Sequence, residues 1–120
     1  MGVLRLSDVA RKLAETGVCK DPPRPPVEEI SPPPVAVEKI AEVLAVLAEP
    51  NRLKILYLLR QSPMPVCFLS YILGLDRTVV SHHLVRLKAA GLVKVSRSGQ
   101  YSIYSLSEEG RRWVDAVFSV

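Results

Sequence analysis

A chain of 120 residues is long enough for one compact domain with an extension, and therefore for one modest hydrophobic core. No stretch approaches the roughly 20 apolar residues of a membrane span, and the N-terminus lacks the apolar segment of a signal peptide, so we expect a cytoplasmic protein without membrane contact. The sequence also lacks a glycine-rich phosphate loop and the HExxH and GxSxG motifs, which leaves an enzymatic function without support.

The formal net charge of +4 is concentrated in the middle of the chain. Residues 1–50 sum to −2 and residues 108–120 to −1, whereas residues 51–107 hold eight basic side chains and a single acidic one, Asp76, for a net charge of +7. Such an excess is typical of segments that bind a polyanion such as DNA. The alternative is an ordinary solvated basic surface.

The first 34 residues favour an arm rather than a domain. Ser7 is a candidate N-cap for a short amphipathic helix that runs to about Thr16, and Gly17 ends it. Residues 20–34 include seven prolines, and because proline has no amide donor we expect a stiff linker or surface strap there. The predicted organisation is an N-terminal helical arm (residues 1–19), a proline-rich linker (residues 20–34) and one domain (residues 35–120).

The domain begins and ends with helices that have more apolar surface than one small core requires. Residues 35–48 have apolar side chains around a broad helical face, and residues 107–118 form an amphipathic helix that Ser107 can cap. Between them, a further helix starts near Pro50 and ends at Arg60. The excess apolar surface predicts contact with a second subunit. The predicted dimer residues are Val37, Ile40, Leu44, Trp113, Val117 and Phe118.

The most informative stretch is residues 77–91, with the sequence RTVVSHHLVRLKAAG. Val80, Leu84 and Leu87 recur at helical spacing and form one apolar face. The opposite arc consists of short hydrogen-bonding side chains, a valine and a guanidinium, namely Thr78, Ser81, His82, Val85 and Arg86. Because side chains of these types can reach base edges and phosphates, we predict a DNA recognition helix.

The neighbouring segments complete a winged helix-turn-helix. Residues 66–73 form a short apolar helix, Gly74 can adopt the left-handed conformation that ends a helix, and Asp76 can cap the next one. Residues 92–106 alternate on either side of a glycine-containing turn and predict a β-hairpin. The expected fold is mainly α with a small β-hairpin, in the order α-α-α-α-β-β-α after the N-terminal helical arm.

Predicted DNA contacts follow from this layout. The side chains expected in or beside the major groove are Thr78, Ser81, His82 and Arg86, with Arg77 at the DNA backbone. The wing is expected to contact phosphates or the minor groove through Lys94, Arg97, Ser98 and Gln100. His82 and its neighbour His83 point about 100° apart on a helix, so they cannot bind one ion together, and we expect His83 to be packed or half-buried.

Three strings carry a resemblance to a known family: LAEPNRLKILYLLRQ (residues 47–61), VVSHHLVRLKAAGLV (residues 79–93) and YSIYSL (residues 101–106). Together they resemble the ArsR (arsenical-repressor) family of winged-helix transcription regulators, over residues 35–120. The resemblance implies a homodimer in which the first and last helices of the domain pair across the two-fold axis. It also implies repression, and the partner would be double-stranded DNA at an imperfectly palindromic operator.

The two cysteines leave the effector open. Members of the resembled family often bind thiophilic metals through a Cys-Val-Cys pair, but here the matching residues are Pro65, Val66 and Cys67. One interpretation is a thiophilic metal site formed by Cys67 and Cys19 from one or both subunits. A second is a disulfide that acts as a redox switch, since one asparagine and two glutamines are typical of a thermophile, where intracellular disulfides occur. In the third, Cys67 is simply a small buried hydrophobe.

The sequence therefore predicts a homodimeric, sequence-specific DNA-binding transcription regulator, with the sign of repression taken from the resemblance. Two alternatives stay open, namely a DNA- or chromatin-binding protein without an effector and a winged-helix module that binds other proteins. The salt dependence of DNA affinity and the ratio of specific to non-specific binding separate these possibilities. No cofactor is expected beyond the metal ion that Cys19 and Cys67 could hold.

Overall fold

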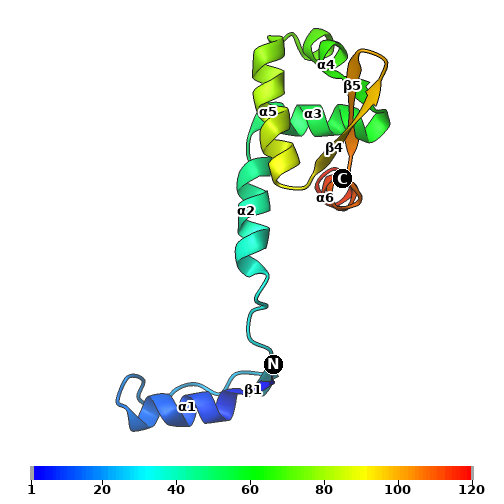
Figure 1. Cartoon of the computed structure of the whole chain (residues 1–120). Coiled ribbons are helices and arrows are strands. Elements are labelled where there is room, and N and C mark those ends of the chain that lie inside the picture. Colours follow the sequence, from blue (N-terminus) through cyan, green and yellow to red (C-terminus); the bar gives the residue numbers. More distant parts are fainter. Residues whose placement is uncertain (1, 120) are drawn as a thin grey trace. The chain divides into compact units, whose positions relative to one another are not determined.

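The computed structural model describes residues 2–119, which form two compact units, one ending at Val37 and the other beginning at Glu38 (Figure 1). The division falls at the start of helix α2 (Val37–Leu47), just after the proline-rich segment. Within residues 2–119, no helix has both the length and the apolar character that a membrane crossing requires.

The N-terminal unit is built on one amphipathic helix, α1 (Leu6–Glu15). Strands β1 (Leu4–Arg5) and β2 (Glu29–Ile30) pair antiparallel, so the proline-rich segment returns the chain to the start of this helix. None of residues 2–37 is buried, because one ten-residue helix and a two-residue ladder offer too little apolar surface for a core.

A carboxylate from the far end of this unit caps α1. The helix begins at Leu6, and Arg5, at the N-cap position, makes no side-chain capping bond. Instead, Glu28 Oε1 accepts a hydrogen bond from the Ser7 amide at 2.6 Å, and this bond holds the pKa of the Glu28 carboxyl below its ordinary value. The prediction of Ser7 as the N-cap is wrong because the capping group comes from 21 residues away, which a local pattern cannot show.

The second unit has the predicted winged helix-turn-helix order, with one additional short strand (Figure 1). Besides α2, its helices are α3 (Pro50–Gln61), α4 (Val66–Leu73), α5 (Arg77–Ala89) and α6 (Glu108–Val117). Its strands are β3 (Met64–Pro65), β4 (Val93–Ser98) and β5 (Tyr101–Leu106), which pair antiparallel in the order β3-β5-β4. The predicted fold class is confirmed.

Two element boundaries differ from the predictions, and both lie near prolines. Helix α2 begins at Val37 rather than at residue 35, since residues 32–34 are all proline and Val35 lies in the turn that follows them. Strand β3 is not in the predicted order of elements, because Pro65 lacks an amide and argues against a strand. The structure places β3 at the sheet edge, where a missing donor is tolerated, with Pro65 opposite Ile103.

The connection between α4 and α5 is held by a glycine and by hydrogen bonds from one serine. Gly74 adopts the left-handed conformation, with a φ of 66°, and ends α4 as predicted. The Leu75 amide donates to the Ser70 carbonyl at 3.1 Å, and the Ser70 hydroxyl donates to the Leu75 carbonyl. Asp76 occupies the N-cap position of α5, but its side chain makes no capping bond, so that part of the prediction is wrong.

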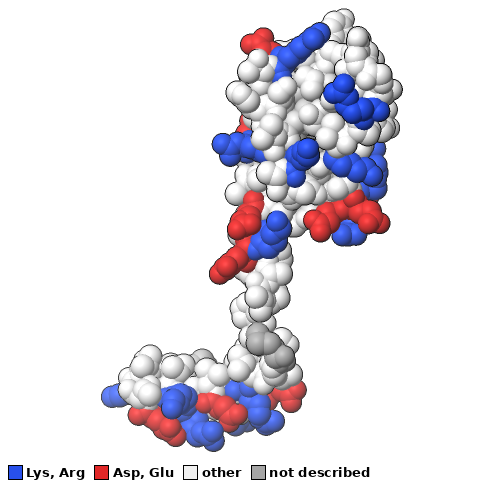
Figure 2. Space-filling model, viewed as in Figure 1, with Lys and Arg blue, Asp and Glu red and all other residues white. Residues whose placement is uncertain are grey.

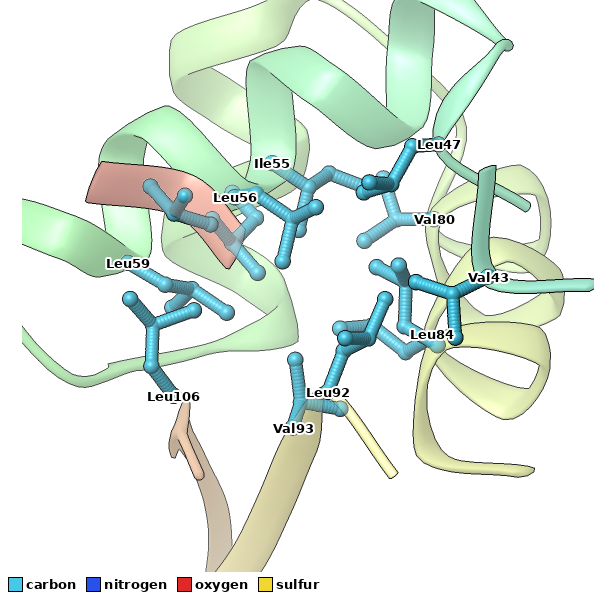
Figure 3. Close-up of a cluster of buried hydrophobic side chains, with 13 residues drawn as sticks. Val43, Leu47, Ile55, Leu56, Leu59, Val80, Leu84, Leu92, Val93 and Leu106 are labelled. Carbon is cyan, nitrogen blue, oxygen red and sulfur yellow. The ribbon is translucent and has the colours of Figure 1, made fainter. Parts of the chain in front are cut away.

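Buried hydrophobic side chains from α2, α3, α4, α5, α6 and the hairpin form one core in this unit (Figure 3). Ile55 and Leu56 of α3 point into the same interior as Val80 and Leu84 of α5. Each such side chain contributes about 1.5–3 kcal/mol when fully buried, so the core fixes the helices on one another.

Helix α6 is anchored through its first turn. Ser107 Oγ accepts a hydrogen bond from the Gly110 amide at 2.9 Å, as predicted for this N-cap, and the Ser107 hydroxyl donates to the Gly91 carbonyl at 2.6 Å. The Ser107 amide donates to the Leu92 carbonyl at 3.0 Å. These bonds bring Gly110 so close to Leu92 that a Cβ at residue 110 would lie 2.8 Å from the Leu92 carbonyl carbon and overlap its oxygen.

Gly110→Ala is therefore expected to lower the free energy of unfolding by about 1–3 kcal/mol, because backbone rather than a flexible side chain blocks the added methyl group. Urea unfolding followed by circular dichroism measures the change. Gly2→Ala is the matched control, since a Cβ at residue 2 meets nothing within 4 Å. Equal unfolding free energies for the two variants would contradict the close approach.

Candidate nucleic-acid interface

Helix α5 is fixed on the domain by its apolar edge. Val80, Leu84 and Leu87 are each at most 1% exposed and recur every three or four residues. They belong to the same core as Ile55 and Leu56 of α3 (Figure 3). Because this edge cannot leave the core without exposing it to water, the helix presents only its opposite arc to a ligand.

The opposite arc of α5 carries most of the predicted DNA contacts. The exposed members are Arg77, Thr78, His82 and Arg86, while Ser81 is half-buried at the margin. Val85 lies on this arc with 66% of its surface exposed, and the sequence analysis assigned it no contact. An exposed valine among such neighbours is chemically useful, because its methyl groups can pack against the C5-methyl group of thymine.

The wing is a tight hairpin with a polar tip. Its strands stay paired as far as Ser98 and Tyr101, which leaves a two-residue turn with Gly99 at a φ of 61°. Such turns need a positive φ, so glycine is the residue that fits. Arg97, Ser98 and Gln100 are exposed at this tip, as their predicted role requires.

Lys94 stands apart from the other predicted wing residues. It pairs with Ser105 near the base of the hairpin and lines a surface hollow with Arg111 of α6. Four residues of extended strand, roughly 13 Å, separate Lys94 from Ser98, and strand alternation puts Lys94 and Arg97 on opposite faces. The tip and the base of the wing therefore face different surroundings.

The charge of this unit is spread rather than gathered at one point. In Figure 2, Lys and Arg side chains form several separate patches over the winged-helix unit, whereas the two signs are intermixed on the N-terminal unit. Cations at separate places can each meet a different phosphate along a duplex.

A polar cluster beside α5 joins three elements. Glu49, at the N-cap of α3, accepts a hydrogen bond from the Arg52 amide at 2.9 Å. The Arg52 guanidinium donates through Nε to the Val46 carbonyl at 2.6 Å, and its Nη1 lies 3.3 Å from His83 Nδ1. His83 Nε2 is 3.6 Å from Glu49 Oε2, and only 16% of the His83 side chain is exposed. The prediction of a half-buried His83 is confirmed.

The electrostatics of this cluster favour an ionised Glu49. Burial raises the pKa of the Glu49 carboxyl, but hydrogen bonds from the amides of Arg52 and Asn51 and the positive charge of Arg52 lower it below its ordinary value. Neither Glu49 nor Arg52 was predicted as part of the site. A carboxylate directly before Pro50 was a local signal for a helix cap, whereas the contact of Arg52 with a residue 31 positions away had no local signal.

Comparisons with known proteins now decide the family. The model of the bacterial regulatory protein arsR family matches residues 49–95. The transcriptional regulator NmtR of Mycobacterium tuberculosis is 42% identical over 71 residues, which are 59% of this chain and 59% of NmtR. The transcriptional repressor SmtB of Mycobacterium tuberculosis is 38% identical over 90 residues, which are 75% of this chain and 62% of SmtB. The chain belongs to the ArsR family.

Solved structures agree with the ArsR assignment. The homodimeric winged helix-turn-helix DNA-binding domain of Mb0332 from Mycobacterium bovis, a possible ArsR-family regulator, matches with a TM-score of 0.64 and 29% identity over 73% of this chain and 86% of that domain. The present chain matches only about three fifths of the length of NmtR and of SmtB. These two relatives are described as a transcriptional regulator and a transcriptional repressor, and neither is described as an enzyme.

The ArsR cysteine pattern is incomplete here. Cys67 is the second residue of α4 and is half-buried, and Pro65 stands where the first cysteine of the family pair was expected. Cys19 belongs to the N-terminal unit, where its amide donates to the Leu13 carbonyl at 3.2 Å. Both are free thiols, and the described residues 2–119 contain no group of three or more His, Cys, Asp or Glu side chains arranged to hold a metal ion.

The predicted dimer residues of α2 lie on a second apolar face of that helix. Val37, Ile40 and Leu44 are 41–49% exposed. Val43 and Leu47 of the same helix are buried in the core. Helix α2 therefore uses one apolar face within the subunit and leaves the other in solvent.

Of the predicted dimer residues near the C-terminus, Phe118 lines an apolar groove. Trp113 and Phe118 are half-buried, and Val117 is exposed. Phe118 packs edge-on against Tyr57 of α3 with ring centroids 5.0 Å apart, and both line the groove together with Leu73. Exposed apolar surface of this kind is typical of subunit contacts.

Proposed function

We propose that the protein is a homodimeric, sequence-specific DNA-binding transcription regulator that acts as a repressor. The observation that carries this proposal is a core-anchored helix with a polar exposed arc, followed by a hairpin with a polar tip, on a strongly basic segment. ArsR membership supports a role in transcription regulation, and the description of the related SmtB as a repressor supports repression rather than activation. A DNA target also assigns the protein to the cytoplasm.

In this proposal α5 lies in the major groove and the wing lies over the adjacent backbone. The side chains that read base edges are Thr78, Ser81, His82 and Arg86, with Val85 against thymine methyl groups. The side chains that contact phosphates or the minor groove are Arg77, Arg97, Ser98 and Gln100. Lys94, at the base of the wing, attracts DNA at longer range.

A second copy completes the operator contact. The proposed dimer surface consists of Val37, Ile40, Leu44, Trp113, Val117 and Phe118. The homodimeric state of the related Mycobacterium bovis domain supports it. Two α5 helices related by a two-fold axis enter successive major grooves, so the operator is an imperfect palindrome with half-sites about 34 Å apart.

We also propose that Cys19 and Cys67 make DNA affinity respond to oxidation. Two thiols form a disulfide when they lose two protons and two electrons to an oxidant such as glutathione disulfide, and no other side chain is required. A closed zinc site, in contrast, takes four ligands. Both thiols are free and only half-buried, so each keeps partial access to an oxidant.

Replacement of His82 tests the orientation of α5. His82→Ala is expected to reduce discrimination between the operator and mismatched duplexes by about 1–3 kcal/mol, because a base contact is lost. Fluorescence anisotropy with DNA from just upstream of the protein's own gene measures it. Equal weakening on every sequence would contradict this orientation, and no DNA affinity at physiological salt would favour a protein-interaction module.

Replacement of Arg97 tests the role of the wing tip. Arg97→Ala is expected to weaken binding to all duplexes alike and to reduce the slope of log K against log salt by about one, because a phosphate contact is lost. Lys94→Ala removes the same charge from the base of the wing and is the matched control, with a slope closer to that of the wild type. Identical slopes for both variants would show that the tip has no special role.

A charge on the exposed face of α2 tests the dimer. Leu44→Glu is expected to convert the dimer to monomers in sedimentation velocity and to lower operator affinity at least about tenfold, because a buried unpaired carboxylate disfavours association. Tyr71→Glu adds the same charge at a side chain that is 89% exposed on α4 and should leave the sedimentation coefficient unchanged. A Leu44→Glu dimer would place the subunit contact elsewhere.

Operator binding under reducing and then mildly oxidising conditions tests the cysteine proposal. The wild type is expected to lose affinity on oxidation, whereas Cys19→Ser and Cys67→Ser should each retain it, because either change prevents the disulfide. Affinity that is indifferent to oxidation but falls with added zinc would favour the metal interpretation. Indifference to both would show that the cysteines have no effector role.

A further inference from the structure

The side chain of Arg52 contacts two helices at once. Its Nε donates to the carbonyl of Val46, in the last turn of α2, at 2.6 Å. Its Nη1 lies 3.3 Å from Nδ1 of His83, which is in the middle of α5. The guanidinium thus reaches from the helix that carries the proposed dimer face to the proposed recognition helix.

The chemistry of this contact fixes the state of His83. A guanidinium has only donors, so Nδ1 of His83 must accept the hydrogen bond and the imidazole proton must be on Nε2. Nε2 faces the Glu49 carboxylate at 3.6 Å. The guanidinium therefore donates to one ring nitrogen of His83, while the other ring nitrogen lies 3.6 Å from the Glu49 carboxylate, which is too far for a hydrogen bond.

The hydrogen bond between Arg52 and His83 restrains the orientation of α5 in a way that apolar packing does not. Burial of Val80, Leu84 and Leu87 holds the helix against the domain, but dispersion and the hydrophobic effect are not directional. A hydrogen bond to a side chain on the flank adds a directional restraint on small rotations about the helix axis. His83 is such a side chain, and it directly follows His82, which is exposed on the DNA-facing arc.

We propose that Arg52 and His83 are positioning residues for DNA recognition, which couple the end of α2 to the rotation of α5 about its axis. The proposal rests on the proposed function, because it assumes that α5 reads DNA and that α2 contacts the second subunit. It adds a route by which the geometry of the subunit pair determines how the arc around His82 meets the base edges.

Two pairs of variants test the coupling. His83→Gln keeps one acceptor and one donor, whereas His83→Leu keeps a similar volume without either. Arg52→Met removes the guanidinium, and Arg60→Met is its matched control, because Arg60 is on the same helix and pairs with Asp115 of α6 at 3.1 Å instead of with α5. Each variant is compared with the wild type for operator affinity, mismatched-duplex affinity, thermal unfolding and sedimentation.

We expect His83→Leu and Arg52→Met each to lower the ratio of operator to mismatched affinity about tenfold, with the dimer intact. His83→Gln should restore most of the ratio, and Arg60→Met should leave it unchanged. The double variant with both Arg52→Met and His83→Leu should lower the affinity ratio no further than the more damaging single change does. If the two side chains acted independently, the two single effects would instead multiply, to within about twofold. A purely structural role would instead lower the unfolding temperature and both affinities together.

The state of the His83 ring can also be tested by NMR spectroscopy in the absence of DNA. Nitrogen-15 chemical shifts of the His83 ring should show an unprotonated Nδ1 and a protonated Nε2 in the wild type, and Arg52→Met should change this tautomer while Arg60→Met should not. An unchanged tautomer, or an affinity ratio that survives both His83→Leu and Arg52→Met, would overturn the positioning role alone. A wild type that binds operator and mismatched DNA equally would contradict the proposed function itself.

Discussion

Every proposed contact with a base edge depends on the burial of one edge of α5. Val80, Leu84 and Leu87 cannot leave the core without exposing it, and a helix with one edge fixed has only one arc to offer. The left-handed Gly74 and the two hydrogen bonds between Ser70 and Leu75 fix the start of the helix. Apolar packing thus determines the position of α5 and which arc faces outward, and polar contacts on the flank of the helix refine its rotation about the axis.

Much of this architecture could be predicted from the sequence because its causes are local. Helical spacing of apolar residues identified the buried edge of α5. The conformational freedom of glycine located the end of α4 and the turn of the hairpin. The exposed arc followed from the same periodicity. Of the predicted arc, Thr78, His82, Val85 and Arg86 are exposed and Ser81 is half-buried. Val85 was given no contact, yet its exposure shows that an apolar residue can belong to a polar surface.

The features that could not be predicted from the sequence are long-range contacts and a strand that contains proline. The cap of α1 by Glu28 joins residues 21 positions apart, and the Arg52–His83 contact joins residues 31 positions apart, so neither had a local signature. Strand β3 was hidden because Pro65 argues against a strand unless the strand is at an edge. Asp76 shows the opposite error, since a suitable residue at an N-cap position does not guarantee the bond.

The N-terminal unit has no buried side chain among residues 2–37. Its order comes from a short ladder, a helix and one distant cap, so no change within it can open a cavity in the core of the winged-helix unit. Substitutions in the N-terminal unit are constrained only by the contacts of its surface, whereas substitutions in the winged-helix unit are also constrained by core packing. We therefore expect substitutions in this segment to change its surface contacts and leave the packing of the winged-helix core as it is.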